Sequence, residues 1–202
     1  SNLGDRDAAA QQFERAAGLI DRALAISPRD AEVLSDASTL NRRRCDFALQ
    51  AEDRDAALRF GAAAVDLAEQ SIARDTNNLA ARDARALAWF SLGRAQAGVD
   101  QKVALAHFER ARAHFAERAR KGEVPLRESG LIELYTADLL IKQRDTERAP
   151  RHARESLRIA NEVLAARPND QMAQFDVAAA AGQLASILYN SGEQEAPVEY
   201  FH

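Results

Sequence analysis

The sequence contains little of what interrupts or cross-links a chain. Among 202 residues there are 9 glycines, 5 prolines and one cysteine, Cys45. A single cysteine forms neither a disulfide framework nor a cysteine metal cluster, which fits a reducing compartment. No apolar run approaches the roughly 18 residues that span a bilayer, and no signal peptide is present. We therefore expect a cytoplasmic protein, or a soluble domain of a membrane-anchored parent.

Strand signals are also absent, because no run alternates β-branched and aromatic residues between turn dipeptides. Hydrophobic residues make up 47% of the chain, enough for a sizeable core, and strong helix formers such as alanine, leucine, glutamate and arginine are abundant. The net charge is -4, and the signs alternate along the chain, as at Glu14-Arg15 and Glu109-Arg110. Such alternation describes solvated helix faces and disfavours nucleic-acid binding. The predicted fold class is all-α.

One stretch, residues 149–168, shows the helical pattern most clearly. Its apolar and small residues recur every three or four positions, on one face of a helix. They are Ala149, Ala153, Ser156, Leu157, Ala160, Val163 and Leu164. An alanine occupies the same point in five similar segments, at Ala9, Ala57, Ala104, Ala149 and Ala196, with steps of 48, 47, 45 and 47 residues. Self-similarity of this length is the signature of a stacked-repeat protein.

The pattern predicts nine helical segments joined by short links. The first eight cover about residues 5–26, 30–50, 55–74, 79–97, 101–121, 126–143, 149–168 and 170–189, and the ninth is unfinished at His202. Residues that end helices, such as Pro28, Gly122 and Pro125, fall between these segments. Because the links are short, neighbouring helices are expected to be antiparallel.

This pattern resembles the tetratricopeptide repeat family, which pairs two antiparallel helices with a small residue early in the second helix and a proline after it. The small residues here are the five alanines above, each preceded by an acidic residue at Asp5, Asp53, Asp100, Asp145 or Glu193. Two closing prolines, Pro28 and Pro168, are present. The step of about 47 residues exceeds the family's 34, which indicates helices about two turns longer. The chain is therefore similar to the long-helix, kinesin-light-chain-like variant found in bacterial signalling proteins such as eukaryotic-type serine/threonine kinases.

The resemblance implies an α-solenoid, a right-handed superhelix whose concave face is lined by the first helix of each pair and holds a segment of a partner protein. The expected organisation is a tag scar at residues 1–2 and one domain at residues 3–202. Its repeat units are about 3–28, 29–75, 76–122, 123–168 and an incomplete 169–202. We expect the last segment to leave Val198, Tyr200 and Phe201 uncovered, so that self-association through the terminal helix is one outcome.

The sequence carries no Gly-rich phosphate loop, kinase signature or nucleophile elbow, so we expect this segment to be non-catalytic and to bind no cofactor. Its best metal candidates, His107 and His114, are seven residues apart rather than the four of a helical zinc pair, and we expect no metal site. His152 lies among arginines and is interpreted as a surface residue.

Arginine and tryptophan supply the candidates for partner binding. Arg42, Arg43 and Arg44 fan out over about 200° of a helix, so they cannot all face one ligand. Arg42 either packs on a solvated face or points into the groove and pairs with an acidic or phosphorylated partner. Trp89 has the same offset from its repeat's alanine as Arg42, so it is either an interface anchor or a core residue.

The remaining candidates are polar residues of the first helices. Asp138 and Lys142 have the spacing of an intrahelical pair, which is the preferred interpretation. Gln50 and Gln96 lie near helix ends, where they could bond a peptide backbone. The full set of partner-binding candidates is Arg42, Asp46, Gln50, Arg85, Trp89, Arg94, Gln96, Asp138 and Lys142.

We therefore expect a non-catalytic protein interaction module that captures a protein or peptide segment in a concave groove. A second hypothesis is that the chain is the regulatory or sensing region of a bacterial signalling enzyme, in particular of a serine/threonine kinase. A helical phosphopeptide site is a third, and it requires arginines from different repeats to converge, with Arg42, Arg85 and Arg94 as the contributors.

Overall fold

A computed structural model describes residues 2–123 and 125–191. These residues form eight helices and no strand, so the all-α prediction is confirmed for them. The helices are α1 (Asn2–Ile26), α2 (Ala31–Gln50), α3 (Arg54–Arg74), α4 (Leu79–Gln96), α5 (Gln101–Arg120), α6 (Arg127–Lys142), α7 (Ala149–Ala166) and α8 (Gln171–Ser191). Their bounds differ from the predicted ones by at most three residues. The predicted ninth segment, with Ala196, Val198, Tyr200 and Phe201, lies outside the described residues.

Side-chain caps at the starts of helices recur along the chain. Turns that lead into α2, α4 and α8 end in Asp30, Asn78 and Asp170, whose side chains accept hydrogen bonds from backbone N–H groups of the following helix. The turns into α3 and α5 end in Asp53 and Asp100, which cap in the same way. Such caps satisfy N–H groups that the first helical turn leaves without partners.

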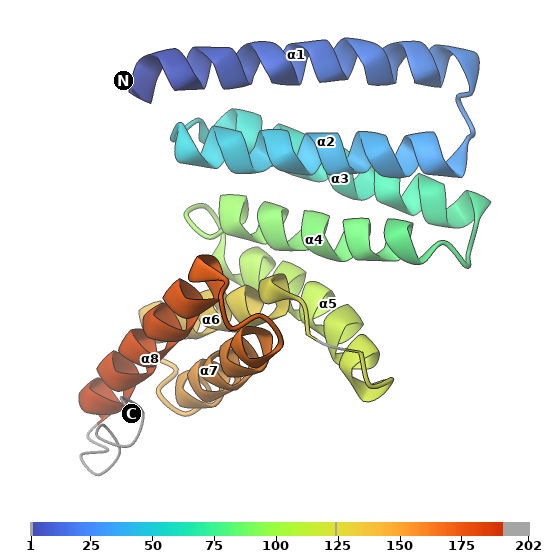
Figure 1. Cartoon of the computed structure of the whole chain (residues 1–202). Coiled ribbons are helices and arrows are strands. Elements are labelled where there is room, and N and C mark those ends of the chain that lie inside the picture. The colour runs from blue at the N-terminus through green and yellow to red at the C-terminus, as the bar shows by residue number, and fades with distance from the viewer. Residues whose placement is uncertain (1, 124, 192–202) are drawn as a thin grey trace. The chain divides into compact units, whose positions relative to one another are not determined.

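The chain divides into two compact units, Ser1–His107 and Phe108–His202, and α5 runs across the boundary. In the first unit α2 packs on α3, α4 packs on both α3 and α2, and α1 packs on α2 (Figure 1). A buried hydroxyl ties the first pair together, because Ser38 Oγ donates to the Ala64 carbonyl at 2.7 Å.

The second unit has the same pattern of neighbours. Helix α7 packs on α6, and α8 packs on both (Figure 1). Ser156 Oγ donates to the Gly130 carbonyl at 3.0 Å, so a serine again joins the two helices of a pair.

Three of the five repeating alanine positions lie in the core. Ala57, Ala104 and Ala149 are fully buried, whereas Ala9 is half-buried. A small side chain suits such a position because packed helices approach each other closely there. None of the helices in the described parts of the chain is long and apolar enough to cross a membrane.

Candidate functional site

The structure brings three of the predicted partner-binding residues together on α2 and α4. Asp46 of α2 lies between two arginines, with Arg42 Nη1 at 3.0 Å from its Oδ2 and Arg94 Nη1 at 2.9 Å from its Oδ1. Ser91 of α4 donates its hydroxyl to the same Oδ1 at 2.9 Å. We call these four residues the Asp46 cluster. Arg42 lies on α2 and Arg94 on α4, so arginines from two helices that are not consecutive in the chain converge here.

The Asp46 cluster is half-exposed and positively charged. The side chains of Arg42, Asp46 and Arg94 are 20%, 25% and 25% exposed, and two guanidinium groups face one carboxylate. A guanidinium carries five N–H donors, and the surplus charge suits a further acidic group. Arg94 also lies 5.7 Å from the centre of the Phe90 ring, which helps to fix its orientation.

Cys45 precedes Asp46 in the sequence, lies near the charges of this cluster and is fully buried. Burial, and secondarily the Asp46 carboxylate, raise the pKa of its thiol from 9.0 to about 12. A neutral buried thiol behaves as a small apolar group that fills the core near the charges.

The two neighbouring arginines point elsewhere, as the fanning of the run predicts. Arg43 is exposed, whereas Arg44 pairs with Glu14 of α1 at 2.8 Å and stacks on Phe60 of α3 at 4.1 Å. Arg44 therefore ties three helices of the first unit together, and Arg42 alone of the three joins the Asp46 cluster.

Trp89 lies in a different environment from Arg42. It is half-buried and packs against a small apolar cluster that includes Val65 of α3 and Leu92 of α4. The Arg85 guanidinium lies 4.7 Å from the centre of its ring. The Nε of Arg85 is buried without a hydrogen-bond partner among the described residues. This packing favours the interpretation of Trp89 as a core residue.

The other predicted residues lie apart from the Asp46 cluster. Asp138 and Lys142 of α6 form an exposed intrahelical pair at 2.7 Å, the preferred of the two interpretations. Gln50 is exposed at the end of α2, where its backbone carbonyl accepts a hydrogen bond from Arg6. Gln96 is half-buried at the end of α4.

The interpretation of His152 as a surface residue is wrong. Its Nδ1 lies 2.6 Å from Oε2 of Glu133, and the two side chains are 20% and 7% exposed. The pair links α7 to α6. Arg151 precedes His152 and Arg154 follows two residues later, so the sequence neighbours suggested solvent, but the imidazole contacts Glu133 of α6. No group of three or more metal-ligating side chains occurs among the described residues.

The structure contains a pocket in the second unit that the sequence analysis did not predict. It lies at the turn before α6, where the side-chain cap found at other helix starts is missing. The turn from α5 to α6 has Gly122 at a positive φ of 80°, and Leu126 precedes α6 without a side-chain cap. The turn is held by Arg118, whose Nε donates to Glu123 Oε2 at 2.6 Å. An irregular turn in a regular repeat is where a site is expected.

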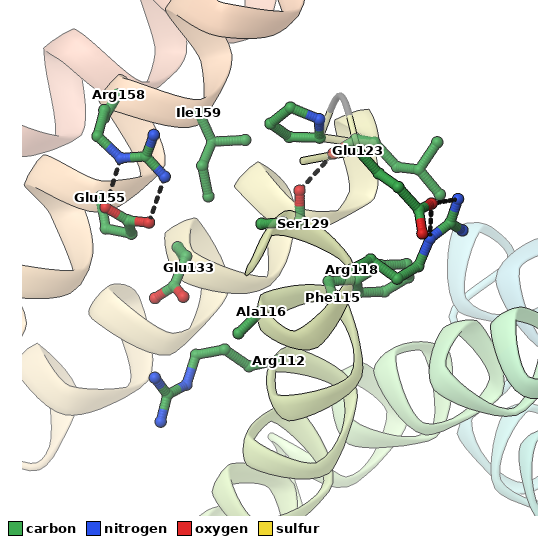
Figure 2. Close-up of a pocket in the computed structure, with 13 residues that line it drawn as sticks. Arg112, Phe115, Ala116, Arg118, Glu123, Ser129, Glu133, Glu155, Arg158 and Ile159 are labelled. Atoms are coloured by element: carbon green, nitrogen blue, oxygen red, sulfur yellow. Dashed lines mark hydrogen bonds and ion pairs between the residues drawn. The ribbon is translucent and has the colours of Figure 1, made fainter. Parts of the chain in front are cut away.

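The pocket beneath this turn has a volume of about 60 Å³. Phe115, Leu126 and Ile159 supply apolar walls, and the carboxylate of Glu133 and the guanidinium of Arg112 lie toward its other side (Figure 2). Arg158 donates to both oxygens of Glu155 at the rim and holds the pKa of that carboxyl below its usual range. A volume this small accommodates a few waters or the tip of a side chain rather than a drug-sized ligand.

Comparison with protein families and with curated proteins gives no further guide to these sites. No protein-family model matches the chain, and no curated protein matches it. The chemistry of the sites therefore has to be inferred from their own geometry. The Asp46 cluster offers paired cations on adjacent helices, and the pocket offers a small, mixed apolar and charged recess.

Proposed function

We propose that this chain is a non-catalytic protein interaction module of the tetratricopeptide-like kind, and that the Asp46 cluster holds an acidic side chain of a partner segment. The observation that carries the proposal is the convergence of Arg42 and Arg94, from α2 and α4, on one half-exposed carboxylate. Interaction surfaces of stacked repeats are formed by adjacent repeats in this way.

Asp46 has a definite role in this proposal. It holds both guanidinium groups in place before a partner arrives, so less side-chain entropy is lost on binding. It also leaves an excess of one positive charge, which a carboxylate or phosphate of the partner neutralises with two parallel hydrogen bonds. The partner is therefore an acidic or phosphorylated protein segment.

Affinity capture with matched variants tests the proposal. The full chain serves as bait in lysate of its source cell beside Arg42→Ala, Arg94→Ala and Trp89→Ala, with Arg43→Ala as the control. Arg43 adjoins Arg42 but is exposed and outside the cluster. Captured proteins are identified by mass spectrometry, and circular dichroism checks that helicity is unchanged.

We expect a discrete partner with the wild type and with Arg43→Ala that is lost with Arg42→Ala and Arg94→Ala. Retention of the same partner by both of these variants would contradict the proposal. If only Trp89→Ala loses the partner, the partner binds at the side of α4 that carries Arg85 and Trp89 instead of at the Asp46 cluster.

A further inference from the structure

Helix α8 packs on α6 and α7 (Figure 1) and carries an apolar stripe on its exposed side. Its large members are Met172, Phe175 and Tyr189, whose side chains are 52%, 65% and 80% exposed. Exposed small residues lie between them, and every step along the stripe is three or four residues, so its members share one face of the helix. We call this set the α8 stripe, and its members are Met172, Phe175, Ala178, Gly182, Ser186 and Tyr189.

The α8 stripe carries no charge. The one charged residue of α8 is Asp176, which is buried and binds Arg127 of α6. Exposed apolar residues of α1 differ in this respect, because Arg22 lies on the same face between Leu19 and Ile26. In a chain of which 29% is charged, a continuous exposed stripe without charge indicates an interaction surface for an apolar partner.

The order of residues along the α8 stripe is symmetric about Gly182. Phe175 lies seven residues before Gly182 and Tyr189 lies seven residues after it, and Ala178 and Ser186 lie four residues before and after it. A two-fold axis at Gly182 therefore sets two antiparallel copies of α8 together with aromatic residues opposite aromatic residues and small residues opposite small ones. A surface that is its own complement in this way is what an isologous contact between identical chains requires.

The glycine at the centre of the stripe has no explanation within one copy. Gly182 lies in the interior of α8, where glycine is less favourable than alanine. A Cβ at this position would meet no heavy atom within 4 Å, so no contact within the described residues requires a glycine. A second helix that crosses at Gly182 gives the reason, because small residues at the crossing let two helix axes approach closely.

The exposed apolar area agrees with a weak dimer. An aromatic side chain offers about 150–250 Å², so the exposed parts of Met172, Phe175 and Tyr189 amount to about 400 Å² per copy. Covered on two copies, together with the small residues between them, this surface is about 1,000 Å², the lower limit of a specific interface. We expect a dissociation constant on the order of 10 μM, so that the protein is a monomer well below this concentration.

We propose that the α8 stripe is the interface of a symmetric dimer, in which a second copy of this chain covers it. The two α8 helices are antiparallel and cross at Gly182, with Phe175 of each copy against Tyr189 of the other. The proposal does not depend on the Asp46 cluster or on the function proposed for it. It differs from self-association through Val198, Tyr200 and Phe201, which lie outside the described residues.

Analytical ultracentrifugation of the full chain over a wide range of concentrations tests the proposal. The key variant is Phe175→Ala/Tyr189→Ala. Its control is Leu19→Ala/Ile26→Ala, which removes side chains that are 61% and 84% exposed from α1. Circular dichroism checks that the helicity of each variant is unchanged.

We expect the wild type and the control to dimerise with the same dissociation constant, and the key variant to dimerise at least roughly tenfold more weakly. A wild type that stays monomeric over the whole range would overturn the proposal. An equal weakening in the control and the key variant would also overturn it, because the loss would then reflect apolar surface in general.

The two-fold geometry has a separate test at Gly182. In the proposed dimer this position faces its own copy, so Gly182→Lys brings two positive charges together and Gly182→Glu two negative charges. Each variant alone should therefore be monomeric, whereas an equimolar mixture should form a heterodimer. Both residues favour a helix over glycine and the space is open, so the fold is kept. Gly18→Lys, at a similarly open position in α1, should dimerise like the wild type.

The same measurements distinguish other occupants of the stripe. Dimerisation of Gly182→Lys alone, or a mixture of the two charged variants that stays monomeric, would overturn the two-fold contact. If a monomeric wild type becomes a dimer when Val198, Tyr200 and Phe201 are replaced by serine, the chain's own end covers the stripe and the proposal fails. A monomeric wild type that binds phosphatidylcholine vesicles, with binding lost in Phe175→Ala/Tyr189→Ala, would make the stripe a lipid-binding surface instead.

Discussion

In each unit an ion pair joins two helices that are not consecutive, α2 to α4 in the first unit and α6 to α8 in the second, and the acid and the base are placed in opposite order. In the first unit the acid, Asp46, is on the earlier helix α2, and it is shared by Arg42, Arg94 and Ser91. In the second unit the base, Arg127, is on the earlier helix α6. Its guanidinium donates two hydrogen bonds to Asp176 of α8, from Nε to Oδ2 and from Nη2 to Oδ1, the second at 2.8 Å.

The difference lies in exposure and in charge balance. The side chain of Asp176 is 10% exposed and meets one cation, Arg127, whose own side chain is 34% exposed, so this pair is neutral and its carboxylate is nearly buried. Asp46 is 25% exposed and meets two cations, so its cluster keeps a surplus charge within reach of solvent. A neutral pair with a nearly buried carboxylate fixes the position of one helix on another, whereas a cluster with a more exposed carboxylate and two cations can also accept a ligand.

The largest effect that tests this comparison is expected from Arg127→Ala. The change leaves the buried Asp176 carboxylate without its cation, so we expect a loss of about 2 kcal/mol in the free energy of unfolding. Arg94→Ala should cost less than about 1 kcal/mol, because Asp46 keeps Arg42 and Ser91. Urea unfolding followed by circular dichroism measures both.

The double variant Arg127→Ala/Asp176→Ala is the control for this prediction. It removes the uncompensated carboxylate as well, so it should recover part of the loss. If Arg127→Ala and Arg94→Ala lower the free energy of unfolding equally, the two ion pairs contribute equally to stability and the proposed division of roles is wrong.

The helix contacts of the two units differ in a second way, which glycine substitutions test. A Cβ added at Gly61 of α3 would lie 3.2 Å from both Cα and Cβ of Leu92, on the backbone of α4. A Cβ at Gly130 of α6 would be crowded only by the Cγ2 methyl of Ile159, at 3.3 Å, because Cβ of Ile159 and the carbonyl oxygen of Ser156, both at 3.7 Å, lie at ordinary contact distance. We expect Gly61→Ala to cost about 2 kcal/mol, because α3 and α4 must move apart.

Gly130→Ala serves as the comparison for Gly61→Ala. A side-chain methyl can shift, and alanine favours the helix by about 1 kcal/mol over glycine, so the net change should lie near zero. Trp89 is the single tryptophan of the chain, so its fluorescence during urea unfolding reports the first unit, where Gly61 lies. A Gly61→Ala protein as stable as the wild type would contradict the close approach of α3 and α4.

The buried thiol near the Asp46 cluster predicts a dependence of stability on pH. The pKa of Cys45 is raised, so between about pH 9 and about pH 12 the folded protein keeps a proton that the unfolded chain releases. Its contribution to stability is therefore complete below pH 9 and is lost as pH rises, by at most about 1.4 kcal/mol per pH unit. The nearby charges are Asp46, Arg94 and Arg42.

Because lysines and tyrosines also titrate in this range, Cys45→Ala is the reference protein. The difference in unfolding free energy between the wild type and Cys45→Ala should be constant from neutral pH to about pH 9. It should then change by about 1 kcal/mol in favour of Cys45→Ala by about pH 10. A difference that stays constant across this range would mean that the thiol titrates normally.

The helices could be predicted closely because local rules determine them. Asp30, Asn78 and Asp170 mark helix starts by capping, and the spacing of alanines such as Ala57 and Ala149 marks the faces that pack. The division into two units could not be predicted, because it depends on which distant helices touch, and a regular repeat pattern contains no signal for that.

The site could be predicted only in part, for the same reason. Arg42 was identified from the basic run, and its offset from the following alanine aligned it with Trp89. Its partner in the structure is Asp46, four residues along α2, and Asp46 in turn binds Ser91 and Arg94 of α4. His152 was misread because its sequence neighbours are arginines, whereas its partner, Glu133, is 19 residues away on α6. Cross-helix pairs of this kind follow from helix rotation, which a spacing of three and four determines only roughly.

The smallest predicted effect concerns Gly182, in the interior of α8. It is exposed, and a Cβ there would meet no heavy atom within 4 Å, in contrast to Gly61. Gly182→Ala should therefore stabilise the protein by about 0.7 kcal/mol, since alanine loses less backbone entropy in a helix and gains no clash. Urea unfolding of the variant measures this gain, with Gly182→Ser as a weaker helix former for comparison. A loss of stability instead would show that another segment covers this face of α8 closely, and the contrast with Gly61 would disappear.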